Sequence, residues 1–356
     1  MKNFKKIVAL LLCVVFVVAM VSVSVAEPAE ETGEKNYSNI TIIMANYSQP
    51  TSIYGQRVQD FADYLEEHSG GKITCQIFFN EEFCGGREEL DYLRDGALDI
   101  VCSSIGPIGK VIPFFGIDFD GDGYEESVEL EYKLMVENEE SAAIIQNACE
   151  AKGFHILPAF GVGESWYPSK TEIKSWDDFT KANFGAERVI NVYDKLGLHS
   201  QQMAMSDIYE SLSRGVIDAT GTALPNLMSN RFYDVCPYLL TGVGGTINCA
   251  MCINLDFWNS LTEDDQALII EANDYSVETA TENSKALKEE SLKTFEEAGC
   301  TVNVFSQEDV DLYNSLNGQC NYDSFYELAE QEGLVDEFNR FVEIWSEYTG
   351  TEIEFK

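Results

Sequence analysis

Residues 85–100 read GGREELDYLRDGALDI, and residues 205–218 read MSDIYESLSRGVID. Each stretch predicts a helix that ends at a glycine, Gly96 or Gly215, because glycine readily takes the positive φ of a helix C-cap. A short apolar segment then predicts a strand. Since the same order of helix, glycine and strand occurs twice, the chain is expected to contain two similar α/β units.

Small polar residues follow both predicted strands. Ser103 and Ser104 follow the first strand, and Thr220, Gly221 and Thr222 follow the second. Ligands of α/β sheets bind beyond the carboxyl ends of the strands. These residues are therefore candidates for a ligand site.

The chain before the first stretch also alternates between strand and helix. Residues 40–45 (ITIIMA) predict a buried strand, and residues 73–79 (ITCQIFF) alternate like a half-buried strand. Between them, apolar residues recur at helical spacing at Tyr54, Val58, Phe61, Ala62 and Leu65. This alternation predicts the α/β class, with parallel strands.

A long helix is predicted over residues 262–298, which contain neither proline nor glycine. Ser260 and Glu263 have the spacing of a capping box, and Gly299 marks the end. At ~1.5 Å per residue this helix would span about 55 Å. That length exceeds one small domain, so we expect the helix to bridge two.

The N-terminus has the pattern of an export signal. Three lysines precede an apolar run over residues 7–23, and Ser24-Val25-Ala26 provides small residues for cleavage before Glu27. Residues 1–26 are predicted to be the signal peptide and residues 27–36 a disordered linker. A membrane anchor is the less favoured alternative. The mature chain is expected in the periplasm or the cell-surface space.

The composition limits the possible partners. The formal net charge is −38, which argues against binding nucleic acid or anionic membrane surfaces. Apolar residues make up 45% of the chain, which is typical of a packed globular protein.

Nine cysteines remain after the predicted cleavage, an odd number that cannot all pair within one chain. Cys249 and Cys252 have CxxC spacing, but they lie in an apolar stretch without a second CxxC or a histidine pair. We expect mostly buried, reduced thiols that pack like small apolar side chains.

Taken together, these segments resemble the solute receptors of TRAP transporters (tripartite ATP-independent periplasmic transporters). The two opening stretches carry the resemblance, with Trp176-Asp-Asp-Phe179, Leu196-Gly197 and Phe257-Trp-Asn-Ser-Leu261. The resemblance implies a two-domain clamshell that closes around one ligand, with a helix spanning both lobes. Lobe I would comprise residues 37–160 with about 249–285, and lobe II residues 161–248 with about 286–356.

In that family an arginine usually grips the carboxylate of the ligand. Here Asn183 stands about where the arginine would be, and Arg188 is nearby. The usual organic-acid specificity is therefore in doubt, and a polyol, a sugar, or a cationic or aromatic ligand is possible. The predicted ligand-binding residues are Asn46, Tyr47, Ser103, Ser104, Glu164, Trp166, Tyr167, Asn183, Arg188, Thr220, Thr222 and Asn248. For Trp166 and Tyr167, ordinary packing in the wall is the alternative.

Residues 118–129 match the calcium-loop pattern D-x-D-x-D-G-x5-E. The predicted ligands are Asp118, Asp120, Asp122, the carbonyl of Tyr124, and Glu129. We expect a structural Ca²⁺ site, and a solvated acidic loop is the alternative. No organic cofactor is expected.

The expected function is capture of a small polar ligand and its delivery to membrane permease subunits by a monomeric receptor. An enzyme is disfavoured, because His68, His155 and His199 have neither metal spacing nor a nucleophile motif beside them. A sensory binding protein with the same fold remains an alternative.

Overall fold

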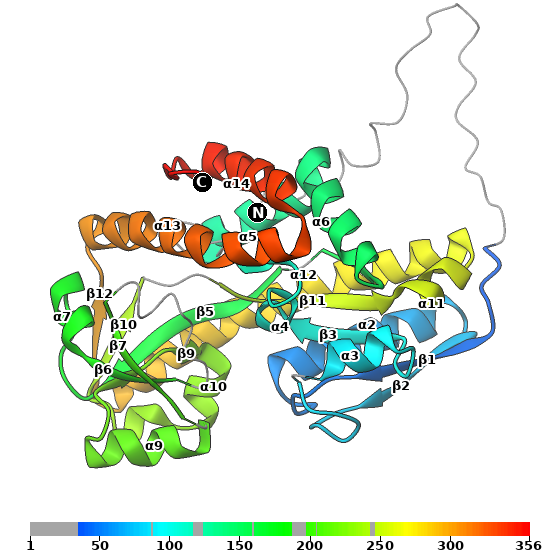
Figure 1. Cartoon of the computed structure of the whole chain (residues 1–356). Helices are drawn as coiled ribbons and strands as arrows, with labels where there is room; N and C mark the ends of the chain where they lie inside the picture. Colours follow the sequence, from blue (N-terminus) through cyan, green and yellow to red (C-terminus); the bar gives the residue numbers. More distant parts are fainter. Residues whose placement is uncertain are drawn as a thin grey trace, which may run out of the picture. The chain divides into compact units, whose positions relative to one another are not determined.

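The computed structural model describes residues 35–86, 88–116, 124–158, 160–186, 197–203, 205–242 and 246–356. The predicted signal peptide, the first half of the predicted calcium loop, and Arg188 lie outside these ranges. Figure 1 shows the chain with its helices and strands labelled.

The first sheet contains the strands that the opening pattern predicts. Its strands are β1 (Ile40–Ala45), β2 (Ile73–Phe78), β3 (Ile100–Ser104), β4 (Phe154–Ile156) and β11 (Thr246–Asn254). β1 lies between β2 and β3 and is parallel to both, whereas β11 runs antiparallel to β3 and β4. The predicted parallel α/β arrangement is confirmed for β1 to β3.

The second sheet is built around β5. Its strands are β5 (Phe160–Ser169), β6 (Asn183–Ala186), β7 (His199–Gln202), β8 (Ala219–Thr220), β9 (Thr222–Ala223), β10 (Tyr238–Thr241) and β12 (Thr301–Val304). β6 is parallel to β7 and β8, and β10 is antiparallel to β5 and parallel to β12. β11 also pairs with β5, so these two long strands join the sheets.

Helices cover both sheets. The α-helices before the long one are α2 (Ile53–His68), α3 (Glu89–Arg94), α4 (Ile105–Ile108), α5 (Tyr124–Tyr132), α6 (Glu139–Ala151), α7 (Trp176–Lys181), α9 (Met205–Arg214), α10 (Leu224–Ser229) and α11 (Leu255–Ser260). The later ones are α12 (Glu263–Glu297), α13 (Gln307–Glu332) and α14 (Val335–Thr349). Short turns of helix are η1 (Pro113–Gly116), η2 (Lys133–Glu137) and η3 (Phe232–Asp234).

The repeated helix–glycine–strand unit has the same geometry in both copies. Gly96 has φ 73° and Gly215 has φ 70°. After α3 the Ala97 N–H donates to the Tyr92 carbonyl at 3.0 Å, and after α9 the Val216 N–H donates to the Ser211 carbonyl at 2.9 Å. Both helices therefore end in a Schellman motif, as the glycines predict.

The predicted long helix is the continuous, 35-residue α12. It contacts α2 and also β5, α10 and β12, so it reaches elements of both sheets, as expected (Figure 1). Its capping box differs from the prediction. Thr262 and Asp265 form the box, because Ser260 ends the separate helix α11.

Buried apolar residues form clusters on both faces of the first sheet. On one face, Ile42 and Met44 pack with Phe61 of α2 and Leu268 of α12. On the other face, Val101 packs in a cluster that includes residues of α3, α6, α13 and α14. The predicted lobe boundaries stay a prediction. They assign α14 to the second lobe, whereas its apolar face lies in this cluster with first-sheet residues.

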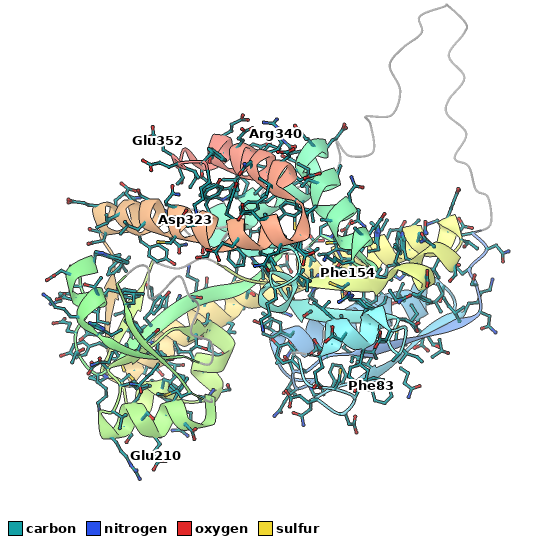
Figure 2. All side chains as sticks on the ribbon, in the orientation of Figure 1. Phe83, Phe154, Glu210, Asp323, Arg340 and Glu352 are labelled. Atoms are coloured by element: carbon teal, nitrogen blue, oxygen red, sulfur yellow. The ribbon has the colours of Figure 1, made fainter. Side chains whose placement is uncertain are left out.

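An ion pair on the surface also connects α14 with α6. Arg340, labelled in Figure 2, donates to both carboxylate oxygens of Glu140 at 2.8 and 2.7 Å. Within the described part of the chain, no helix is both long and apolar enough to cross a bilayer.

Candidate functional site

The first group of predicted site residues lies where β1 and β3 end. These strands are parallel, and Ala45 pairs with Val101, so their carboxyl ends meet. Asn46 is buried, its side-chain amide donates to the Cys102 carbonyl at 3.1 Å, and its Oδ1 accepts from the Ser48 N–H at 3.0 Å. Asn46 therefore fixes the loop after β1 to the end of β3.

β11 brings Asn248 to the same place. Cys249 pairs with Ser104 of β3 on one side, and Asn248 pairs with Gly161 of β5 on the other. Asn248 is 7% exposed, and within the described residues its Oδ1 has no hydrogen-bond partner. Ser103 is fully buried at the end of β3. The strands of both sheets therefore meet at a buried, unused acceptor.

Thr220 and Thr222 come from the second sheet. Thr220 ends β8 and pairs with Gly185 of β6, while Thr222 in β9 pairs with Trp166 of β5. Thr220 is fully buried, and its hydroxyl has no hydrogen-bond partner in the part of the chain that the structure describes. Thr220 and Asn248 thus share the property of a buried polar atom left unused by the protein.

Trp166 and Tyr167 are core residues. Trp166 is fully buried in a cluster that includes helix α9. The Tyr167 ring lies 5.0 Å from the Phe179 ring, edge to face, and a Cβ added at Gly221 would lie 2.7 Å from it. Wall packing, the alternative from the sequence, therefore describes both rings in this structure, and a stacking role stays a prediction.

β6 is the strand that would carry the arginine clamp of the family, and its residues Asn183–Ala186 include no arginine. Asn183 lies at the start of β6, where its backbone and side-chain N–H groups both donate to Asp218 at 3.0 and 2.8 Å. The β6 residue level with Thr220 is instead Gly185. A Cβ there would lie 2.5 Å from Ile217 Cδ1 and 2.8 Å from Met203 Sδ, so the ends of these side chains would have to shift for a longer residue.

Other predicted contacts are only partly described. Arg188 lies outside the described residues, as do the side chains of Ser104 and Glu164. Tyr47 is partly exposed after β1, and its ring packs against Gly86, where an added Cβ would lie 2.9 Å away. Their contacts with a ligand stay predictions.

A buried guanidinium lies close to these strand ends. Arg57 of α2 is 1% exposed and donates to the Cys249 carbonyl at 2.8 Å, to the Cys249 Sγ at 2.9 Å, and to Asn273 Oδ1 of α12 at 3.1 Å. The Cys102 thiol in turn donates to the Cys249 Sγ at 3.6 Å. Arg57 therefore connects α2, β11 and α12 through one polar network.

This network favours a deprotonated Cys249. The hydrogen bond from Cys102 lowers the pKa of Cys249 most, Arg57 lowers it further, and burial opposes both. A buried guanidinium is also strongly disfavoured without a nearby negative charge. All nine cysteines of the described chain are free, and six are buried, as the sequence analysis expects.

A buried carboxyl lies on the other side of Tyr47. Glu89, the first residue of α3, is fully buried, and burial raises its pKa to about 8. The Tyr47 backbone amide lowers the pKa of this carboxyl, although it does not make a hydrogen bond of normal geometry to either carboxyl oxygen. Glu89 is therefore largely protonated at neutral pH.

The sequence analysis missed Arg57 and Glu89. Arg57 lies three residues after Tyr54 and therefore on the apolar face of its helix. Glu89 lies four residues before Leu93 and is likewise on the apolar face of its helix. A charged residue on an apolar face was the available signal. Which partners it meets depends on the strands that pack above it.

The calcium prediction stays untested. Asp118, Asp120 and Asp122 lie outside the described residues, and Tyr124 begins α5. Glu129 is exposed and pairs with Lys133 at 2.8 Å. Within the described ranges, no three histidine, cysteine or acidic residues are grouped to hold a metal ion.

One surface hollow lies away from the strand ends. It is formed by α14 and the C-terminal tail and is lined by residues that include Ser346, Gly350 and Phe355. None of the predicted site residues lies in it, so we do not assign the ligand to it.

Comparison with known proteins shows which proteins the chain resembles. The chain is 25% identical over 269 residues to the C4-dicarboxylate-binding periplasmic protein DctP of Rhodobacter capsulatus, covering 74% of this chain and 79% of that protein. It is 24% identical over 287 residues to the ectoine-binding periplasmic protein TeaA of Halomonas elongata, covering 79% and 83%. A TRAP periplasmic solute-binding protein from Desulfovibrio salexigens with bound orotic acid superposes with a TM-score of 0.73 at 16% identity, covering 87% of this chain and 98% of that one.

The two joined α/β sheets, the helix that contacts both, and the polar strand ends define a clamshell solute receptor. The family described as bacterial extracellular solute-binding protein, family 7, matches residues 44–316, and the chain belongs to it. The resemblance to TRAP receptors is thereby confirmed. The protein is a solute-binding receptor of a TRAP-type transporter and not an enzyme.

Proposed function

We propose that this receptor captures a small ligand rich in hydrogen-bond donors, such as a polyol, a sugar or an amine. The observation that carries the proposal is the unused Oδ1 of Asn248, an acceptor that is buried where β3, β5 and β11 meet. An unpaired buried acceptor costs about 1–3 kcal/mol, which a ligand N–H or O–H would recover. The Thr220 hydroxyl offers a second such contact from the other sheet.

A plain organic acid fits this set less well. A carboxylate cannot donate to the Asn248 Oδ1, and β6 carries no arginine over Asn183–Ala186. The relatives named above bind ligands as different as C4-dicarboxylates and ectoine, so membership of the family leaves the ligand class open.

The remaining parts of the proposal follow from the family and the N-terminal sequence. A signal peptide removed before Glu27 would export the chain, and the mature monomer would deliver its ligand to membrane permease subunits. A structural Ca²⁺ in residues 118–129 is part of the proposal. A sensory binding protein, the alternative function, would bind its ligand in the same way. Permease genes adjacent to the gene of this protein would favour transport over sensing.

A melting-temperature screen tests the proposed ligand class. Refolded protein, free of ligand carried through purification, is heated with carboxylates, sugars, polyols and amines, with and without calcium. We expect a donor-rich compound to raise the Tm, because a ligand that binds only the folded state stabilises it.

Variants locate the binding in the predicted site. Asn248→Leu and Thr220→Val are expected to remove the shift in Tm. Thr241→Val is the matched control, because its buried hydroxyl already donates within the second sheet, to the Asn303 carbonyl at 3.4 Å. A shift caused only by dicarboxylates, or one that survives both site variants, would contradict the proposal.

A further inference from the structure

Glu89 has no use in the fold that offsets its burial. The residue is fully buried at the start of α3, and among the described residues neither carboxyl oxygen has a hydrogen-bond partner of normal geometry. Leu90 and Leu93 of the same helix pack into the apolar cluster. A carboxyl in this position therefore lowers stability unless something outside the fold pairs with it.

Within the part of the chain that the structure describes, the groups that interact with Glu89 supply no positive charge. Glu89 interacts electrostatically with side chains from the loop after β1, the loop after β2, β3 and β11. These are Tyr47, Glu81, Cys84, Cys102 and Cys252. Each of them is neutral or negative, so within the described chain an ionised Glu89 would meet only unfavourable charges.

Glu89 lies at the predicted ligand site. The Tyr47 phenol and the Tyr47 backbone both act on the Glu89 carboxyl, and Tyr47 is partly exposed at the end of β1. Asn46, next to it, fixes this loop to β3. Tyr47 therefore links the buried carboxyl to the predicted ligand site.

We propose that Glu89 is a specificity-determining residue that binds a cationic N–H group of the captured ligand, an ammonium or an amidinium. The inference rests on the proposed function and narrows the ligand from a donor-rich compound to one that carries a positive charge. A cation provides both the donors that the two oxygens lack and the charge that the surroundings lack. A neutral hydroxyl would provide only a donor.

Binding in this way releases a proton. Burial raises the pKa of the empty-site carboxyl to about 8, and an adjacent cation lowers it again. At pH 7 the binding of a cation therefore releases about 0.9 proton per ligand. Below pH 8 the affinity should fall about tenfold for each unit of pH, until the carboxyl in the complex also takes up a proton.

The test compares cations with neutral molecules of similar shape. The probes are putrescine against 1,4-butanediol, and ectoine against pyroglutamate, in which a neutral lactam replaces the amidinium. Titration calorimetry on the refolded full mature chain, in buffers of different ionisation enthalpy at pH 6, 7 and 8, gives both affinity and proton release. Three proteins are compared: wild type, Glu89→Gln, and Glu88→Gln, whose side chain is exposed and adjacent.

We expect wild type to bind at least one cation at least tenfold more tightly than its neutral counterpart, with proton release. Glu89→Gln should lose the release and the dependence on pH and bind the cation at least tenfold more weakly, while Glu88→Gln behaves as wild type. Affinity that does not change with pH, an unchanged Glu89→Gln, or no binding of either cation at millimolar concentration would overturn the inference. In those cases a Tm shift by a sugar or polyol would still uphold the proposed function, whereas no shift by any compound would count against both.

Discussion

Arg57 and Glu89 are ionisable side chains with almost no exposure to solvent. They differ in how the fold satisfies them. Arg57 donates to three acceptors, namely a backbone carbonyl, a sulfur and an amide oxygen. Within the described chain, neither carboxyl oxygen of Glu89 has a hydrogen-bond partner of normal geometry. We therefore assign Arg57 to the architecture of the site and Glu89 to the ligand.

Replacing Glu89 should stabilise the empty receptor, and more so at high pH. The pKa of Glu89 is raised in the folded state, so the folded protein holds a proton that the unfolded chain has lost between about pH 4.5 and pH 8. Stability consequently falls as the pH rises through this window. Urea unfolding of Glu89→Gln against wild type should show a stability difference that grows by up to about 4 kcal/mol from pH 5 to pH 8. The growth should be absent from Glu88→Gln, and a difference that does not depend on pH would contradict a buried, protonated acid.

The thiol of Cys249 is expected to be a thiolate at neutral pH. Its hydrogen bond from Cys102 and its contact with Arg57 lower its pKa, so the thiolate absorbance near 240 nm should be present in native protein at pH 7.5. Cys249→Ser should remove that absorbance. Cys252→Ser is the matched control, because burial raises the pKa of this neighbouring thiol. Equal absorbance in the two variants would show that a group other than the Cys249 thiolate balances the charge of Arg57.

Among the elements, the helix–glycine–strand units and the long helix could be predicted from the sequence. Each depends on local signals, namely apolar spacing and a glycine where φ must be positive, and the structure places Gly96 and Gly215 there. The cap of α12 was misplaced by two residues, at Ser260 instead of Thr262. The sequence offers two overlapping boxes, and the choice depends on α11 ending at Ser260.

The two candidate caps can be separated by mutation. Thr262→Ala removes the side chain that accepts from the Asp265 N–H at 3.2 Å and should cost about 1 kcal/mol of stability. Ser260→Ala removes only a hydroxyl that donates to the Phe257 carbonyl, so this variant should cost only a few tenths of about 1 kcal/mol. Denaturant unfolding measures both, and a larger cost for Ser260→Ala would return the cap to the position first predicted.

The calcium loop is a prediction for a single element. Calcium should raise the Tm of wild type, and magnesium should do so less, because the pattern supplies the many oxygens that calcium prefers. Asp120→Ala should remove the shift, with Asp63→Ala on the exposed face of α2 as control. No binding heat and no shift for wild type would leave an acidic, solvated loop.

At the scale of the whole molecule, β5, β11 and α12 reach both sheets, and α13 packs in an apolar cluster of each. This explains why the site was only partly predictable. Thr220 could be found from sequence order, because it ends β8, which is parallel to β6, and parallel strands bring their carboxyl ends together. Asn248 lies near the start of β11, which runs antiparallel to β3, so its place depends on that pairing. The burial of Trp166, the use of Asn183 by Asp218, and the approach of Arg57 to Cys249 depend on pairings between distant segments, which no local pattern contains.

The identity of the ligand that copurifies with the receptor tests the central claim most directly. Native mass spectrometry of protein purified without denaturation, followed by release and fragmentation of the bound compound, identifies its chemical class. The account predicts one small molecule per chain, rich in N–H or O–H donors and bearing an ammonium or amidinium, which is lost on refolding and restored when added back. A stoichiometric, uncharged or purely anionic ligand such as a dicarboxylate would contradict it.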